Sequence, residues 1–275
     1  MNHLHRELAP VSGAAWDEIE AEAKRTLKAS LAARKLVDFV GPKGLTTSAV
    51  GTGRRQAIAA GEERGVEASL HESQPLVEIR VPFELDQAEL DAIDRGAKDG
   101  DLDPVVEAAQ RIARVEDRAI FHGHAPALIK GICECAGEPV SLSENYEDYP
   151  LAVARAVSRL RSAGVDGPYA IALGKRCYVG ITETTKGGYP VIEHVKRLLD
   201  GPLVWAPALD GAAVLSTRGD DFELTVGQDL SIGYLEHDAK KVRLYFQESF
   251  TFRVLTPHAA VALVYGKKGE KKSRG

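Results

Sequence analysis

Few residues in this sequence can bind metals or act as nucleophiles, and their spacing does not complete a site. The candidates are two His-x-His pairs and three cysteines: His3 and His5, His122 and His124, Cys133, Cys135 and Cys177. A zinc site needs four ligands, and neither histidine pair nor the close cysteine pair has a second half nearby in the sequence. We therefore predict no metal site and no cofactor. The odd number of cysteines is typical of reduced thiols in a cytoplasmic protein.

Sequence motifs for nucleophilic and phosphate chemistry are absent as well. The chain has no Gly-x-Ser-x-Gly elbow and no phosphate-binding P-loop, and Gly51-Thr52-Gly53 continues into Arg54 and Arg55 instead of a dinucleotide fingerprint. Carboxylates are plentiful, but they lie on the polar faces of predicted helices, so no acid/base pair stands out. These observations predict a protein that is not an enzyme.

Charge and hydropathy exclude two classes of partner. The 275 residues carry a net charge of −5, but the tail from Lys267 to Gly275 contributes +4, so the preceding body carries −9. An acidic body disfavours nucleic acid. No apolar run approaches the roughly 18 residues that a membrane-spanning helix needs, and the N-terminus lacks an apolar signal region. We expect no nucleic acid, no membrane and a cytoplasmic location.

The strongest structural element is a helix over residues 104–122. Asp103 is its expected N-cap, Pro104 occupies the first turn, and Gly123 is the expected left-handed cap. Apolar residues recur at helical spacing: Val105, Ala108, Ala109, Ile112, Ala113, Val115, Ala119 and Ile120. At 1.5 Å per residue the helix is roughly 30 Å long, and we interpret it as a spine crossing a sheet. An ordinary amphipathic core helix is the alternative.

The N-terminal region predicts a second helix. Ser12 is its expected cap, and the helix runs to about Ala33 before a strand over residues 34–40. One face of this helix is apolar: Trp16, Ile19, Ala23, Leu27 and Leu31. That face predicts packing against the sheet or against a partner.

Residues 46–74 show almost no apolar periodicity, whereas residues 77–85 alternate cleanly between apolar and polar side chains, with Pro82 indicating an edge strand. We predict a long hairpin arm that finds its partner on another molecule. A disordered insertion is the alternative. Asp86 and Glu89 then form an expected capping box for a short helix.

The C-terminal half mixes helices and strands. Helices are predicted at 150–163 and 190–199, strands at 169–173, 203–205, 213–216, 222–226, 242–246, 250–255 and 259–265, and a polar loop at 183–189. The order lacks a regular βαβ repeat. The predicted fold class is therefore α+β with two lobes.

Six stretches resemble one known family. They are LHRELAP with the following Trp16, RGAKD at 95–99, VEDRAIFHG at 115–123, GPYAIAL at 167–173, GQDLSIGY at 227–234 and ESFTFRVLTP at 248–257. Together they are similar to family 1 encapsulins, bacterial shell proteins of the linocin type. The resemblance covers residues 1–265 and implies the HK97-type fold of tailed-phage capsid proteins.

The resemblance implies a division of the chain into domains. Residues 1–45 hold the N-terminal helix and the start of the peripheral domain, 46–76 the extended loop, 77–136 the peripheral domain with the spine helix, 137–219 the axial domain, 220–265 the return to the peripheral domain and 266–275 a basic, disordered tail.

It also implies two sites. The loop Glu183, Thr184, Thr185, Lys186, Gly187, Gly188 and Tyr189 matches the region that rings the fivefold pore, where Glu183 and Lys186 select ions. The candidates for a groove that binds the C-terminal targeting peptide of a cargo enzyme are Leu27, Leu31, Arg34, Asp38 and Ile232. Leu27 and Leu31 are expected to form the apolar floor, and Arg34 and Asp38 to fix the peptide's register.

The implied function is an icosahedral shell of about 60 identical subunits around a cargo enzyme, with a dye-decolourising peroxidase expected first and a ferritin-like protein second. A phage capsid protein is the alternative, although the acidic body argues against packaged DNA. An enzyme or antimicrobial peptide is disfavoured, because no nucleophile constellation and no membrane-active helix is found.

Overall fold

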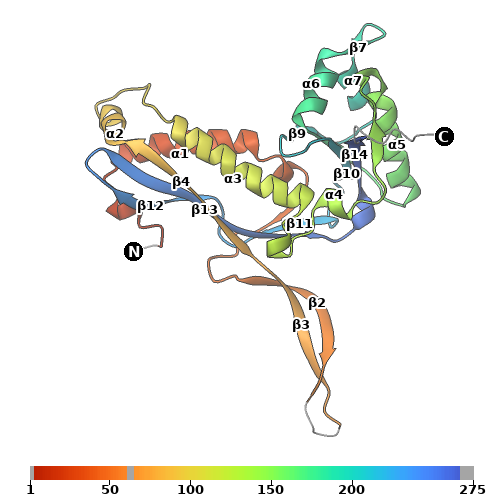
Figure 1. The fold of residues 1–275 in the computed structure, drawn as a ribbon, viewed down its shortest axis with the longest axis horizontal. Coiled ribbons are helices and arrows are strands. Elements are labelled where there is room, and N and C mark those ends of the chain that lie inside the picture. The colour runs from red at the N-terminus through yellow and green to blue at the C-terminus, as the bar shows by residue number, and fades with distance from the viewer. Residues whose placement is uncertain (1–2, 61–64, 267–275) are drawn as a thin grey trace, which may run out of the picture.

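The computed structural model describes residues 3–60 and 65–266, which form two sheets, each with helices, and a projecting hairpin (Figure 1). The helices are α1 Gly13–Ser30, α2 Gln87–Asp94, α3 Asp103–His122, α4 Ile132–Cys135, α5 Tyr149–Ser162, α6 Lys175–Glu183 and α7 Val191–Lys196. The strands are β1 Asp38–Val40, β2 Ala49–Ile58, β3 Ala68–Pro75, β4 Val77–Asp86, β5 Val140–Leu142, β6 Tyr169–Leu173, β7 Thr185–Lys186, β8 Tyr189–Pro190, β9 Leu203–Trp205, β10 Ala212–Ser216, β11 Phe222–Val226, β12 Ser231–His237, β13 Lys241–Val254 and β14 Ala260–Tyr265. The expected α+β class is confirmed; of the basic tail expected at 266–275, residues 267–275 lie outside the described range.

The first sheet is built on β13, a strand of 14 residues. Along one side β13 pairs with β4, and along the other with β12 and then β11, beyond which β1 is parallel to β11. Residues 242–246 and 250–255, expected as two strands, therefore belong to one. Pro82 lies on β4, opposite Tyr245 of β13. Within the described residues β4 has no second neighbouring strand, so the expected edge position of Pro82 is confirmed.

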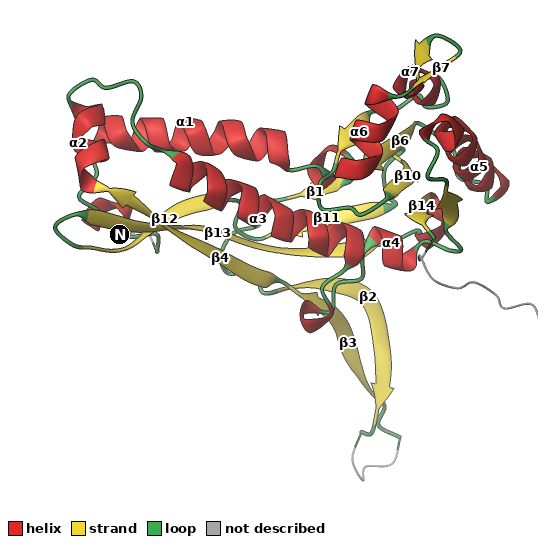
Figure 2. Cartoon of the chain, turned by 45° about the horizontal axis from the view of Figure 1, so that its top comes forward, coloured by secondary structure: helices red, strands yellow, loops and turns green. Residues whose placement is uncertain are grey.

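The spine helix α3 crosses this sheet beside α1, on the same face (Figure 2). Its small residues Ala108, Ala109 and Ala113 are fully buried, as expected for a spine helix that crosses a sheet. Two details of the prediction were wrong. Asp103 is inside the helix, because the side chain of Asp101 accepts its backbone N–H at 3.0 Å, and Val115 is 42% exposed.

Strands β2 and β3 form the predicted arm, a two-stranded hairpin that projects from the first sheet (Figures 1 and 2). Most of its residues are exposed, including Ile58 and Leu70 at 48% and 57%. Its base is fixed: the Leu76 N–H donates to the Ser48 carbonyl at 2.9 Å, and Gln74 Nε2 donates to the Phe252 carbonyl at 2.8 Å. Ordered pairing from Ala49–Pro75 to Ile58–Ala68 favours an arm over a disordered insertion.

The second sheet has the order β5-β14-β10-β6-β9, with every residue of β6 and β10 buried. Helix α5 packs against this sheet, and α6 and α7 extend beyond it (Figure 1). Strand β14 belongs here, so residues 260–265 lie with the second sheet and not with the first, where the expected return segment 220–265 places them. The sequence did not predict α6 or β12. The expected capping box at Asp86 does not form, because Glu89 accepts the N–H of Asp101 instead.

Candidate functional site

Helix α1 carries the first two residues of the predicted peptide groove. Ser12 caps the helix by accepting the Ala15 N–H at 3.1 Å, as predicted, but the helix ends at Ser30 and not at Ala33. Leu27 is partly buried and packs against the apolar cluster under the helix, so part of its side chain remains accessible. Leu31 follows the last turn and is 8% exposed, which leaves it little surface for a ligand.

Arg34 lies in the short 3-10 turn Ala33–Lys35 and is engaged inside the chain. Its guanidinium donates from Nε and Nη2 to Glu116, at 2.9 and 2.6 Å, from Nη1 to Asp229 at 2.8 Å, and from Nη2 to Glu248. Burial lowers the pKa of Arg34, but the hydrogen bonds and charge of Glu116 more than reverse this, so the pKa lies above its ordinary value. Arg34 is therefore a structural hub with little donor capacity left for a peptide.

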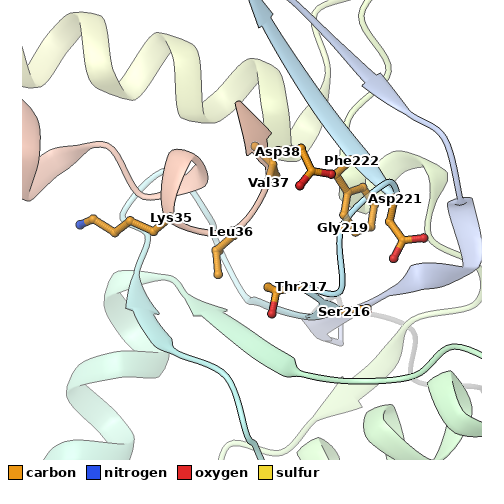
Figure 3. Close-up of a pocket in the computed structure, with 9 residues that line it drawn as sticks. All are labelled: Lys35, Leu36, Val37, Asp38, Ser216, Thr217, Gly219, Asp221 and Phe222. Carbon is orange, nitrogen blue, oxygen red and sulfur yellow. The ribbon is translucent and has the colours of Figure 1, made fainter. Parts of the chain in front are cut away.

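Asp38 points to a different part of the molecule. Its carboxylate accepts the backbone N–H of Asp220 at 2.7 Å, at the turn that enters β11. Figure 3 shows Asp38 beside Gly219, Asp221 and Phe222, on a cavity of about 150 Å³.

Ile232 on β12 is 6% exposed and belongs to the same apolar cluster as the residues below Leu27. The structure thus brings Leu27 and Ile232 to one cluster and gives Arg34 and Asp38 partners of their own. The sequence missed other partly buried side chains around this cluster: Val11, Trp16, Leu230 and Tyr234. Trp16, under the guanidinium of Arg6 at 4.1 Å, was visible as an apolar position of the predicted helix.

The predicted pore loop is a small hairpin and not an irregular loop. Glu183 ends α6, Thr185 and Lys186 pair with Pro190 and Tyr189, and Gly187 and Gly188 have φ of 59° and 84°. Positive φ at both central residues suits a tight two-residue turn. The side chain of Lys186 donates to the carbonyl of Glu147 at 2.9 Å, which ties the hairpin to the turn before α5. The hairpin lies beyond α6 and α7, at the end of the molecule away from the second sheet (Figure 1).

Comparison with known proteins decides the family. A family model described as an encapsulating protein for peroxidase matches residues 1–251. A type 1 encapsulin shell protein of Rhodospirillum rubrum is 55% identical over 270 residues, covering 96% of each chain, and one of Mycobacterium tuberculosis is 50% identical, covering 96% of this chain and 99% of that one. The chain belongs to the type 1 encapsulin shell proteins. It is thus a structural shell protein, as the sequence motifs indicated, in preference to the phage alternative.

Solved structures support the same fold for this encapsulin. A virus-like particle from Pyrococcus furiosus superimposes with a TM-score of 0.63 at 15% identity, covering 90% of this chain and 99% of that one. A solved structure of Mycobacterium phage Bobi gives a TM-score of 0.57 at 14% identity, covering 87% of this chain and 91% of that one. At such identities only the capsid-like fold is shared. Within the described residues, no helix is long and apolar enough to cross a membrane, and no group of three or more metal-ligating side chains occurs.

Proposed function

We propose that this encapsulin assembles into a hollow icosahedral shell of about 60 copies, without catalysis of its own, in the cytoplasm. The observation that carries the proposal is the arm formed by β2 and β3. Among the described residues its strands pair only with each other, Ile58 and Leu70 are exposed, and a hydrogen bond from Gln74 to Phe252 ties its base to the first sheet. An isolated two-stranded hairpin is marginal in water, so such an arm gains its stability from a neighbouring copy.

The proposed cargo is a peroxidase, in line with the description of the matching family, and it is held by a C-terminal targeting peptide. Leu27, which packs against the apolar cluster that includes Ile232, is the apolar contact that the geometry supports best. Leu31, Arg34 and Asp38 are assigned to the same site by resemblance, and their burial or internal hydrogen bonds give them a supporting role in shaping the wall.

The hairpin at residues 183–189 is proposed to line a pore at the fivefold axis. Its exposed polar side chains, and the anchoring of Lys186 on Glu147, present Glu183 and Thr185 at the end of the lobe. A ring of such side chains filters small ions by charge.

Sedimentation velocity and electron microscopy of the protein expressed alone test the assembly. Uniform hollow particles are expected. A monomer or small oligomer that carries all its residues would overturn the shell proposal. Co-expression with a peroxidase, with and without its C-terminal peptide, tests the cargo separately. If the inner surface of the shell binds the peptide, the peroxidase is loaded with the peptide and is not loaded without it.

A further inference from the structure

The interior around Arg34 holds more acid than one guanidinium can neutralise. Glu116 on α3 and Glu248 on β13 both contact Arg34, and both side chains are 0% exposed. Asp229, which precedes β12 in the sequence, is the third partner of Arg34, and its side chain is 42% exposed, so water stabilises its charge. Two fully buried carboxyl groups therefore share one guanidinium, that of Arg34, whose side chain is 16% exposed. Two ionised carboxylates that accept from the same guanidinium nitrogen, Arg34 Nη2, repel each other strongly when water is excluded.

The hydrogen bonds show which oxygen lacks a donor. Both oxygens of Glu116 accept from Arg34, and Glu248 Oε1 accepts from Arg34 Nη2. Glu248 Oε2 is buried and has no donor within the described residues. A carboxylate oxygen in that position is costly, whereas a protonated carboxyl group supplies its own O–H, and Glu248 is held beside Glu116 because both accept from Arg34 Nη2. Burial and the charge of Glu116 raise the pKa of Glu248 well above its ordinary value.

The structure points to a proton-sharing pair: we propose that Glu116 and Glu248 hold one proton between them at neutral pH, and that this proton locks the segment 31–37 to α3 and β13. The inference goes beyond the shell function and does not depend on it. The segment connects α1 to the first sheet, and Arg34 is its link to the pair. Removing the proton at alkaline pH leaves two carboxylates against one guanidinium and opens this connection.

Other titratable groups face the same segment and must be separated from the pair. Asp117 accepts the N–H groups of Ala32 and Ala33 at 3.0 and 2.9 Å, and burial raises its pKa to about 7 against the effect of those donors. Lys35 donates at the surface to the Ala29 carbonyl at 3.4 Å. A group whose native pKa is raised loses its stabilising effect as the pH rises through that pKa. The pH dependence that Asp117 causes therefore ends at about pH 7. Above that pH, the effect of the Glu116–Glu248 pair is observed on its own.

Infrared spectroscopy and hydrogen exchange test the proposal on the whole protein. At about pH 8, above the pKa of Asp117, the spectrum of the wild type is expected to retain the C=O stretch of a protonated carboxyl group, and Glu248→Gln to lose it. Exchange of the peptide covering residues 31–37, corrected for intrinsic rates, is expected to rise by up to about tenfold per pH unit as the pH approaches the pKa of Glu248 in the closed state and to level off above it, because opening releases one proton only while Glu248 is still protonated. In Glu248→Gln this rise disappears.

Glu223→Gln is the matched control. Glu223 also pairs with an arginine, Arg253, at 2.6 Å, but it is partly exposed, and the hydrogen bonds from Arg253 and Thr225 outweigh burial and lower its pKa. This variant should keep both the infrared band and the alkaline rise. If Glu248→Gln does not fold, Glu116→Gln replaces it in both experiments. The infrared spectrum of the wild type tests the protonated carboxyl group without any variant. Absence of a protonated carboxyl band at about pH 8, or an unchanged exchange profile in the folded variant, would overturn the proposal.

Discussion

Leu27→Asp is expected to give intact shells that load little cargo. A leucine side chain contributes about 1.5–3 kcal/mol when it is fully buried. Leu27 is already partly buried in its own chain, so a peptide that covers the rest gains ~0.5–1 kcal/mol from it. A carboxylate in its place loses that gain and must also be desolvated, at a further ~1–3 kcal/mol. Binding of each peptide is thus weakened by ~2 kcal/mol, about 30-fold.

Cargo that engages two peptides at once multiplies these factors, so its avidity falls by roughly 1,000-fold. The assay is co-expression with a peptide-bearing cargo, purification of the shells and measurement of the cargo-to-shell ratio. Ala21→Asp introduces the same charge at an exposed position of α1 and should load normally. Wild-type loading in Leu27→Asp shells would refute the assignment of the groove. Leu31→Asp cannot serve here, because Leu31 is 8% exposed and a buried carboxylate there destabilises the subunit itself.

Three further changes have defined outcomes. Deleting Thr52–Glu72 and joining the paired residues Gly51 and Ser73 through Asn-Gly should give folded but unassembled subunits in sedimentation velocity; assembled particles would show that the arm is dispensable. Asp117→Asn should lower the free energy of unfolding by ~1–3 kcal/mol in urea, because the amide NH₂ opposes one of the two backbone donors, and an unchanged midpoint would contradict this. Gly233→Ala should cost ~1–3 kcal/mol, because the new Cβ would lie 2.3 Å from the ring of Tyr245, with Gly51→Ala as the control without close neighbours.

The parts of the fold that sequence predicted are those in which local signals agree. Ser12 starts α1, small residues mark the buried face of α3, and alternation over residues 77–85 gives β4. Where local signals conflict with the packing, prediction failed. β12 was missed partly because Gly233 weakens a strand, yet the ring of Tyr245 fills the space in which a Cβ would lie. α6 combines β-branched residues with Gly180, which packs against Tyr146.

The candidate site shows a different limit. A leucine on the apolar face of an amphipathic helix is visible in the sequence, and Leu27 is partly buried on that face of α1. The partners of Arg34 are not visible, because they lie 82, 195 and 214 residues away and their side chains look like ordinary surface charges in the sequence. An arginine near a predicted groove therefore suggests a ligand contact, although this one is already bound inside the chain.

The internal hydrogen bonds of Arg34 have a physical consequence for the shell wall. An arginine held by Glu116 and Glu248 cannot leave to bind a peptide without exposing two buried carboxyl groups to each other, and breaking such a buried pair costs about 3–5 kcal/mol. A modest peptide contact does not repay that cost. We therefore expect Arg34 to act on the proposed groove by fixing the position of the 31–37 segment, and the apolar side chain of Leu27 to supply the proposed contact itself. Wall rigidity and peptide affinity are then expected to be separable properties, because Arg34 lies in the segment 31–37 and Leu27 lies on α1.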